Sequence, residues 1–224
     1  FDELGAQRSR TDTRSYRLVA EASGSVGDWE LRASLGLTQV RTTLDMHNFI
    51  SLPALQAALN GGRYVIGADN SAAARAEITP FGRSTSSNTL HFLSLRASRD
   101  LMKLDGGNLT VGTGVEYMRR KLDEHFPEGF SGGAQASNIY AFGVGSQTIS
   151  AAYAELAAPL TKALELNVAA RIDHYDTYGS SFTPKAGLKF VPTPMLTLRG
   201  TYARGFRAPN PVEAGISGSS AGFL

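Results

Sequence analysis

The sequence predicts an all-β fold, an antiparallel up-and-down meander of about eight strands that forms part of a larger transmembrane β-barrel. Two observations carry this prediction. Apolar and polar residues alternate along several long runs, which is the period of a strand with two different faces. Tight turns join these runs in pairs, and two of the three connections from one pair to the next are long polar segments, only 176–180 being short; this is the pattern of consecutive hairpins.

The alternation is clearest in the stretch from residue 164 to residue 209. The apolar residues of its first run are Leu164, Leu166, Val168, Ala170 and Ile172. Charged and polar residues fill most of the intervening positions, beginning with Glu165 and Asn167. Two similar runs follow, and a strand of this length can cross a bilayer when it is tilted.

Eight runs along the chain are candidate strands. Their approximate ranges are 14–24, 28–44, 89–102, 108–121, 147–160, 163–175, 183–190 and 196–202. The third and fourth meet at Asp105-Gly106-Gly107, which supplies the positive φ angles of a hairpin turn. The last two meet at Pro192-Thr193-Pro194, where no ladder N–H is required.

Two connections, 45–88 and 122–146, are long and rich in Gly, Ser, Asn and Ala. The first contains residues 51–59, whose Ser-Leu-Pro start is typical of a capped short helix. It also leaves room for an extra hairpin around residues 62–67. Bacterial outer-membrane barrels have short periplasmic turns and longer extracellular loops. We therefore expect both long loops to be extracellular.

The composition fits a β protein and narrows the function. Hydrophobic residues make up 42% of the chain, the mean hydropathy is -0.15, and no run approaches the roughly 20 apolar residues of a spanning helix. The net charge is +2, from 22 basic and 20 acidic residues, which is too balanced to indicate a nucleic-acid-binding protein. Cysteine is absent, so neither a disulfide framework nor a thiolate metal site is available.

The turn lengths lead us to expect a loop-to-loop fragment of a barrel. If all four tight turns are periplasmic, the first strand begins outside the cell and the eighth ends outside. The tail 210–224 is rich in Gly, Ser and Ala and shows no closing strand. We therefore expect unpaired edges on both flanking strands.

Four motifs carry a resemblance to a known family. They are Ala152 to Leu160, Ala170 to Tyr175, Thr183 to Lys189 and Leu198 to Pro209. In order and spacing they resemble the barrel of TonB-dependent outer-membrane receptors, and the likeness extends to the N-terminal runs, so that residues 1–224 read as part of such a barrel domain. We find no plug domain and no TonB box in the chain, and eight strands are far fewer than the roughly 22 of plugged transporters.

The resemblance implies active uptake across the outer membrane of a Gram-negative bacterium. The substrate would be a scarce nutrient, such as a ferric siderophore, haem, cobalamin or an oligosaccharide, and TonB would supply the energy through the missing plug. The implied partners are outer-membrane lipid, the TonB complex and the substrate, with no cofactor and no nucleic acid. Two other classes stay open, a passive porin or structural barrel and a barrel-embedded hydrolase.

Two sets of residues are candidates for binding. Charged residues that share the parity of the wet strand faces would line the lumen: Glu155, Arg171, Asp173, Lys185, Lys189 and Arg199. Barrel interiors are polar in any case, so we favour structural pairing for these charges. Aromatic residues of the second long loop could stack on a ligand ring: Phe126, Phe130, Tyr140 and Phe142. Loop aromatics more often pin a loop to its neighbours.

We predict neither a catalytic nor a metal site. The four histidines show no His-Glu-x-x-His pattern, and no serine lies in a nucleophile elbow. Asp173, His174 and Asp176 cannot converge on one metal, because successive residues of a strand face opposite sides. Gly143 and Gly145 lack the βαβ context of a phosphate-binding loop. The sequence therefore predicts a protein that is not an enzyme.

Overall fold

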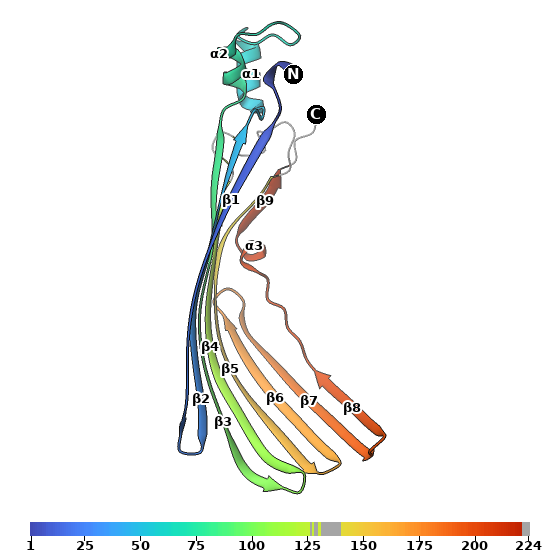
Figure 1. The fold of residues 1–224 in the computed structure, drawn as a ribbon. Coiled ribbons are helices and arrows are strands. Elements are labelled where there is room, and N and C mark those ends of the chain that lie inside the picture. Colours follow the sequence, from blue (N-terminus) through green and yellow to red (C-terminus); the bar gives the residue numbers. More distant parts are fainter. Residues whose placement is uncertain (126, 128–129, 131–139, 221–224) are drawn as a thin grey trace.

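The structure is a computed structural model that describes the whole chain except residues 126, 128–129, 131–139 and 221–224. Eight antiparallel strands follow one another, and each pairs with the next in the order of the sequence (Figure 1). They are β1 (Arg8–Val26), β2 (Trp29–His47), β3 (Gly82–Leu104), β4 (Gly107–Glu124), β5 (Tyr140–Thr161), β6 (Leu164–Tyr175), β7 (Gly179–Thr193) and β8 (Leu196–Ala203). The predicted eight-stranded meander is confirmed.

The turns of the four hairpins β1–β2, β3–β4, β5–β6 and β7–β8 lie together at one end of the sheet, which we call the turn end, whereas the short β6–β7 turn lies at the other end of its strands (Figure 1). In the turn between β1 and β2, Gly27 has a φ of 58°, a conformation that costs glycine little. In the turn between β3 and β4, the Gly106 N–H donates to the Pro159 carbonyl at 3.2 Å. A Cβ atom on Gly106 would lie 2.3 Å from the Thr161 carbonyl oxygen. Glycine is therefore required there, because the turn packs directly on the backbone of the next hairpin.

The register gives the sheet two different faces. On the face that we call outer, one row of directly opposed residues is apolar across seven strands: Ala22, Ala33, Leu95, Val115, Ala152, Ile172 and Phe182. Neighbouring rows extend this surface from Trp29 to Leu37 on β2 and from Leu164 to Ile172 on β6. Eight steps at about 3.3 Å per residue make this apolar band roughly 26 Å long on the strand, close to the height of the lipid-facing band of outer-membrane barrels.

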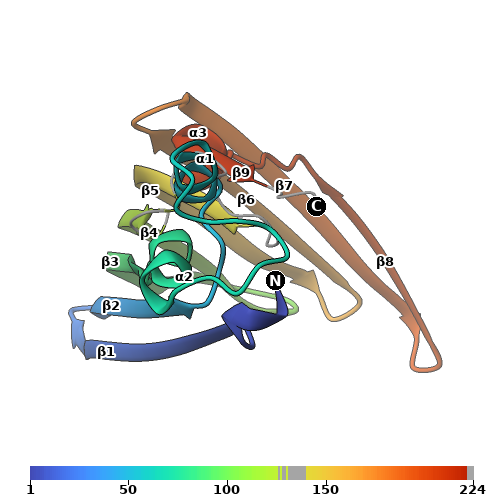
Figure 2. The same ribbon diagram turned by 90° about the horizontal axis from the view of Figure 1, so that it is seen from above.

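The opposite face, which we call inner, is polar. It carries residues such as Glu30, Arg32, Glu116 and Arg171 in the positions between the outer-face residues. Seen from above, the strands from β1 to β8 form an arc that encloses one side of the sheet (Figure 2). The sheet thus has the curvature and the two-faced pattern of part of a larger barrel.

The sheet is open at β1 and β8. Among the described residues, β1 pairs only with β2 and β8 pairs only with β7, as the sequence predicts. The tail is different from the prediction, which assigned it no strand. It contains a short helix α3 (Pro211–Ala214) and a strand β9 (Ile216–Ser220), and β9 pairs antiparallel with β5 at residues 140–144.

The connection between β2 and β3 forms a small helical cap at the end opposite the turns. It holds α1 (Leu52–Asn60) and α2 (Ala72–Ile78), and an N-terminal 3-10 helix η1 (Asp2–Leu4) packs nearby (Figures 1 and 2). The helix expected at residues 51–59 is confirmed, whereas residues 62–67 form turns between the two helices and not an extra hairpin. None of the helices in the described part of the chain combines the length and apolar character that crossing a membrane requires.

Both long connections are shorter than the predicted loops. The flanking strands continue to His47 and start again at Gly82, so residues 48–81 remain of the expected loop 45–88. In the second connection β4 runs to Glu124 and β5 starts at Tyr140, inside the expected loop 122–146. The strands therefore extend well past the apolar band at this end.

Candidate functional site

The six charged residues predicted to line the lumen lie on one face of the sheet. Glu155 on β5 is opposite Ala169 on β6, which is opposite Lys185 on β7. Lys189 is opposite both Glu165 and Arg199, and Arg171 and Asp173 share the parity of Ala169. The register therefore brings all six to the inner face, away from the apolar band.

Arg171 is the centre of an ion-pair network on the inner face. Its Nη1 lies 2.8 Å from Glu116 Oε2, and its Nη2 lies 2.9 Å from Asp173 Oδ1. Glu116 also forms an ion pair with Arg96, in which Arg96 Nη2 lies 3.4 Å from Glu116 Oε1. Asp173 is only 8% exposed, so its charge depends on the arginine that faces it. The network connects β3, β4 and β6 across the small side chain of Ala151 on β5.

The other predicted lumen residues are paired to different degrees. Lys189 Nζ lies 3.1 Å from Glu165 Oε2, so this lysine has a partner on the neighbouring strand. Lys185 and Arg199 are exposed and form no ion pair with any described residue. Structural pairing, which the sequence favours for the set, therefore holds for Arg171, Asp173 and Lys189 but not for these two.

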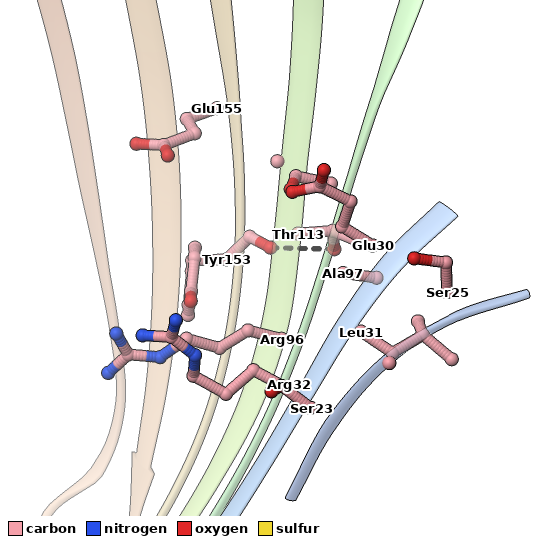
Figure 3. Close-up of a pocket in the computed structure, with 13 residues that line it drawn as sticks. Ser23, Ser25, Glu30, Leu31, Arg32, Arg96, Ala97, Thr113, Tyr153 and Glu155 are labelled. Carbon is pink, nitrogen blue, oxygen red and sulfur yellow. Dashed lines mark hydrogen bonds between the residues drawn. The ribbon is translucent and has the colours of Figure 1, made fainter. Parts of the chain in front are cut away.

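Toward the turn end, the sheet has a hollow of about 490 Å³. Figure 3 shows Arg32 and Arg96 extending to the same side as Tyr153 and Glu155. Arg32 and Arg96 are directly opposite each other on β2 and β3, an arrangement of like charges that is unfavourable and that the contact of Arg96 with Glu116 relieves on one side. Arg32 forms no ion pair with the residues that the structure describes. Glu30 and Glu155 also line the hollow, and Arg32 is its one lining cation without an ion pair among the described residues.

Glycines on the inner face are covered by aromatic rings from the neighbouring strand. A Cβ atom on Gly114 would lie 2.6 Å from Tyr153 Cζ, and one on Gly36 would lie 2.3 Å from Phe92 Cε1. Each ring therefore lies flat over the missing side chain, a pairing that protects the backbone and fixes the ring. The position of Tyr153 beside the hollow follows from Gly114.

The predicted loop aromatics are separated by the structure. Phe130 is 1% exposed and packs with Met46 and Phe49, over Gly82. It anchors the loop to the inner face and does not present its ring to a ligand. Tyr140 and Phe142 belong to β5 and not to a loop, and Phe126 lies outside the described residues.

The tail packs back on β5 through the glycines that the sequence left unexplained. Gln147, 2% exposed, donates through Nε2 to the Pro209 carbonyl at 2.9 Å. A Cβ atom on Gly145 would lie 2.2 Å from the Pro211 carbonyl oxygen, and one on Gly215 would lie 2.1 Å from that of Val144. Gly145 and Gly215 thus allow two backbones to touch.

The helical cap has a small core of its own. Ala58, Tyr64, Ala74 and Ile78 are buried together. The Tyr64 hydroxyl donates to Glu3 Oε1, and burial, with a smaller contribution from this carboxylate, raises the pKa of Tyr64 to about 12. The hydrogen bond from Tyr64 lowers the pKa of Glu3. The cap is therefore tied to the N-terminal segment.

The described residues contain no group of three or more His, Cys, Asp or Glu side chains that could hold a metal ion. The Arg171 network, the Arg32–Arg96 pair and the apolar band are instead features of a membrane wall with a polar lumen. The family model for the TonB-dependent receptor-like β-barrel matches residues 2–223. The chain belongs to this family. A search of curated proteins found no match.

Family membership fixes the general class of the protein. TonB-dependent receptors are receptors and transporters and not an enzyme family, and they are typical of the outer membrane of Gram-negative bacteria. The chain is thus a receptor barrel, in which small-molecule substrates and TonB are the partners that the family implies.

Sequence reasoning missed the cations of the hollow. Arg32 and Arg96 both stand at inner-face parity in their strands, but their parity alone does not show that they are opposite each other. That requires the register between β2 and β3, which the 34-residue connection 48–81 does not determine. The hairpins closed by tight turns were the only pairs whose register the sequence could indicate.

Proposed function

We propose that the chain is the wall of an outer-membrane receptor that takes up a scarce nutrient with energy from TonB. One observation carries the proposal: a single curved sheet has a continuous apolar band on its outer face and a charged, partly unpaired surface on its inner face. A lipid-facing wall around a polar lumen has this pattern. The substrate class is a ferric siderophore, haem, cobalamin or an oligosaccharide.

Within this function, we assign the inner face to contact with the substrate or the plug. Glu155, Lys185 and Arg199 have exposed side chains there, and Arg32 and Arg96 border the hollow near Glu155 (Figure 3). Arg32, Lys185 and Arg199 have no carboxylate partner among the described residues, and such cations favour substrates or plug residues that carry carboxylate or phenolate oxygens. Tyr140 and Phe142 stay candidates for ring contacts at the end opposite the turns.

The function is tested by uptake in cells that carry the full-length receptor. Accumulation of labelled ferric siderophores, haem, cobalamin and oligosaccharides is measured with and without the receptor gene, and with and without TonB. We expect one class to be accumulated only when both are present. Uptake that needs the receptor but not TonB would show a passive channel, and no receptor-dependent uptake of any class would contradict the proposal.

The role of the hollow is tested by removing its two charges. Replacing both arginines, Arg32→Gln with Arg96→Gln, should lower uptake of an anionic substrate roughly tenfold, because two charge-assisted hydrogen bonds are lost. Lys103→Gln with Lys162→Gln removes the same charge at the turn end and serves as the control, since both lysines are exposed beside turns. Equal uptake by the two double variants would remove the hollow from the binding surface.

A further inference from the structure

Beyond the apolar band, the two faces of β1, β2 and β3 carry different kinds of polar residue. The band ends at Leu18 on β1 and at Leu37 on β2, and these strands continue past the level of the β6–β7 turn (Figure 1). The outer face of this continuation is highly charged, with Arg8, Arg10, Asp12, Arg14, Arg41, Asp45 and Arg83. The inner-face positions within 9–15, 40–46 and 82–88, all of them described, hold no charged residue.

Hydroxyl and amide groups take the place of charges on this part of the inner face. Three successive rows of the register contain what we call the hydroxyl wall: Thr11, Thr13, Ser15, Thr42, Ser86 and Asn88. All six residues are exposed or half-buried, and Thr13 Oγ1 lies 3.2 Å from Thr42 Oγ1. Two strand spacings and four residue steps make the wall roughly 10 Å wide and about 13 Å high. The wall is therefore a continuous surface and not an isolated polar position.

Neither the membrane nor strand propensity explains the difference between the two faces. Both faces lie beyond the apolar band at this height, so water reaches both of them. Threonine favours strands on either face, and the outer face has its own pair of opposed threonines, Thr43 and Thr85. The exclusion of charge from these described strands is therefore a property of the surface that faces the lumen.

The chemistry of the hydroxyl wall selects among the substrate classes. A hydroxyl group both donates and accepts hydrogen bonds, so a surface of hydroxyls matches a ligand that is itself covered with them. Val40 and Leu44 lie in the same rows and are half-buried, which adds aliphatic surface. Sugar rings present this combination, with hydroxyls at their edges and C–H groups on their faces. The six wall residues include neither His nor Tyr, which hold haem iron, and no cation for the anionic groups of a siderophore.

Two arginines border the hydroxyl wall on the side of the turn end. Arg17 on β1 and Arg120 on β4 lie in the next row of the inner face, about 7 Å along the strands. Both are exposed and form no ion pair with the residues that the structure describes. The inner-face carboxylates of their own strands, Glu21 and Glu124, are each four residues away, or about 13 Å. Carboxylates of a ligand on the wall can therefore reach these two cations.

We propose that the hydroxyl wall binds an acidic oligosaccharide. The Thr and Ser side chains exchange hydrogen bonds with the sugar hydroxyls, and Arg17 and Arg120 receive the carboxylates of uronic acid units. This inference rests on the proposed uptake function, because it names the substrate class of the same inner face. It adds a surface for first contact above the Arg171 network and the hollow at the turn end.

The test is a calorimetric titration of the full-length receptor, purified in detergent, with a short galacturonate oligosaccharide. The variant Thr13→Val with Thr42→Val should bind it roughly tenfold more weakly than the unmodified receptor, because two hydrogen-bonding groups are lost without a change in side-chain shape. The matched control is Thr43→Val with Thr85→Val, which alters an opposed threonine pair on the outer face. The control should bind as the unmodified receptor does, and equal losses in the two variants would overturn the proposal.

A second pair of variants tests the carboxylates and does not depend on the threonines. Arg17→Gln with Arg120→Gln should weaken galacturonate binding roughly tenfold, whereas Arg41→Gln with Arg119→Gln removes two charges on the outer face of β2 and β4 and should have no effect. The neutral galactose oligosaccharide of the same length should bind the unmodified receptor roughly tenfold more weakly. Equal binding of the acidic and the neutral sugar would contradict the assignment.

The binding experiment and the uptake experiment can fail separately, because binding in detergent requires neither TonB nor a membrane. TonB-dependent uptake of another substrate class, with no galacturonate bound, would overturn this inference and leave active uptake standing. Galacturonate that binds at the hydroxyl wall but enters cells without TonB would support this inference and contradict active uptake.

Discussion

At the scale of single residues, Arg171 neutralises two carboxylates, and one of them, that of Asp173, is buried. Replacing Arg171 with Gln leaves the carboxylates of Glu116 and Asp173 close to each other without their shared cation. The free energy of unfolding of the full-length receptor in vesicles should fall by about 2 kcal/mol, since Arg171 is partly exposed and solvent replaces some of the lost interaction. A denaturant titration measures this.

A second substitution separates charge from packing at the same place. Adding Asp173→Asn to the Arg171→Gln variant removes the buried charge that lost its partner, so about half of the lost stability should return. Lys185→Gln is the control, because Lys185 has no ion pair among the described residues, and its effect should stay within about 0.5 kcal/mol. If the double variant were less stable than the single one, the network would not be electrostatic in origin.

Tyr64 gives the helical cap a dependence on alkaline pH. Its pKa is raised by burial from an unfolded value near 10 to about 12, so the cap favours the neutral phenol. This stabilisation is complete below about pH 10 and is lost as the pH rises through about 12. Limited proteolysis between residues 48 and 81 should therefore accelerate over this interval. In Tyr64→Phe, which has no phenol to ionise, the acceleration over the same interval should be absent.

At the scale of elements, the attachment of the tail to β5 depends on Gly215. In Gly215→Ala the new Cβ would lie 2.1 Å from the Val144 carbonyl oxygen, and backbone cannot move aside as a side chain can. Amide hydrogen exchange in β9 should increase at least roughly tenfold as the strand leaves β5. Gly205→Ala, where nothing lies within 4 Å of the added atom, should leave exchange unchanged. Protected β9 amides in Gly215→Ala would show that the close approach is not required.

The same scale shows which elements the sequence could predict. Eight strands are evident wherever one face is apolar, because alternation then marks every second residue. The predicted first strand starts too late, at Arg14 and not at Arg8, because residues 8–13 are polar on both faces and show no alternation of apolar and polar residues. The predicted second strand ends too early, at Leu44 and not at His47. β9 was missed for another reason: its five residues pair with β5 across more than 70 residues of chain, and no local pattern encodes such a contact.

The candidate site was predictable to a similar extent. Parity alone brought Arg171, Asp173 and Glu155 to the inner face correctly. It could not show that Arg171 reaches Glu116 on β4, because that contact spans β5 and depends on the register of three strands. The burial of Phe130 depends on Gly82, a residue whose missing side chain makes room for the ring. The sequence indicated which residues are polar or apolar, but it did not indicate which distant segments are in contact.

At the scale of the whole molecule, an added charge should destabilise the protein on the apolar outer face but be tolerated on the polar inner face. Leu35 lies within the apolar band on the outer face, and Ser34 precedes it on the inner face of the same strand. In a membrane wall, Leu35→Arg places a guanidinium group in hydrocarbon and should lower the free energy of unfolding by about 2–4 kcal/mol. Ser34→Arg enters the polar lumen and should cost less than about 1 kcal/mol.

This comparison tests the orientation of the wall with one charge moved by one residue. Both variants change net charge and side-chain volume in the same direction, so only the surroundings of the two faces differ. The measurement is a denaturant titration of the full-length receptor in vesicles, repeated in vesicles of shorter acyl chains, where the cost of Leu35→Arg should fall as the band is covered by less hydrocarbon. If Leu35→Arg and Ser34→Arg cost the same, the outer face would not be in contact with lipid, and the assignment of inner and outer faces would have to be given up.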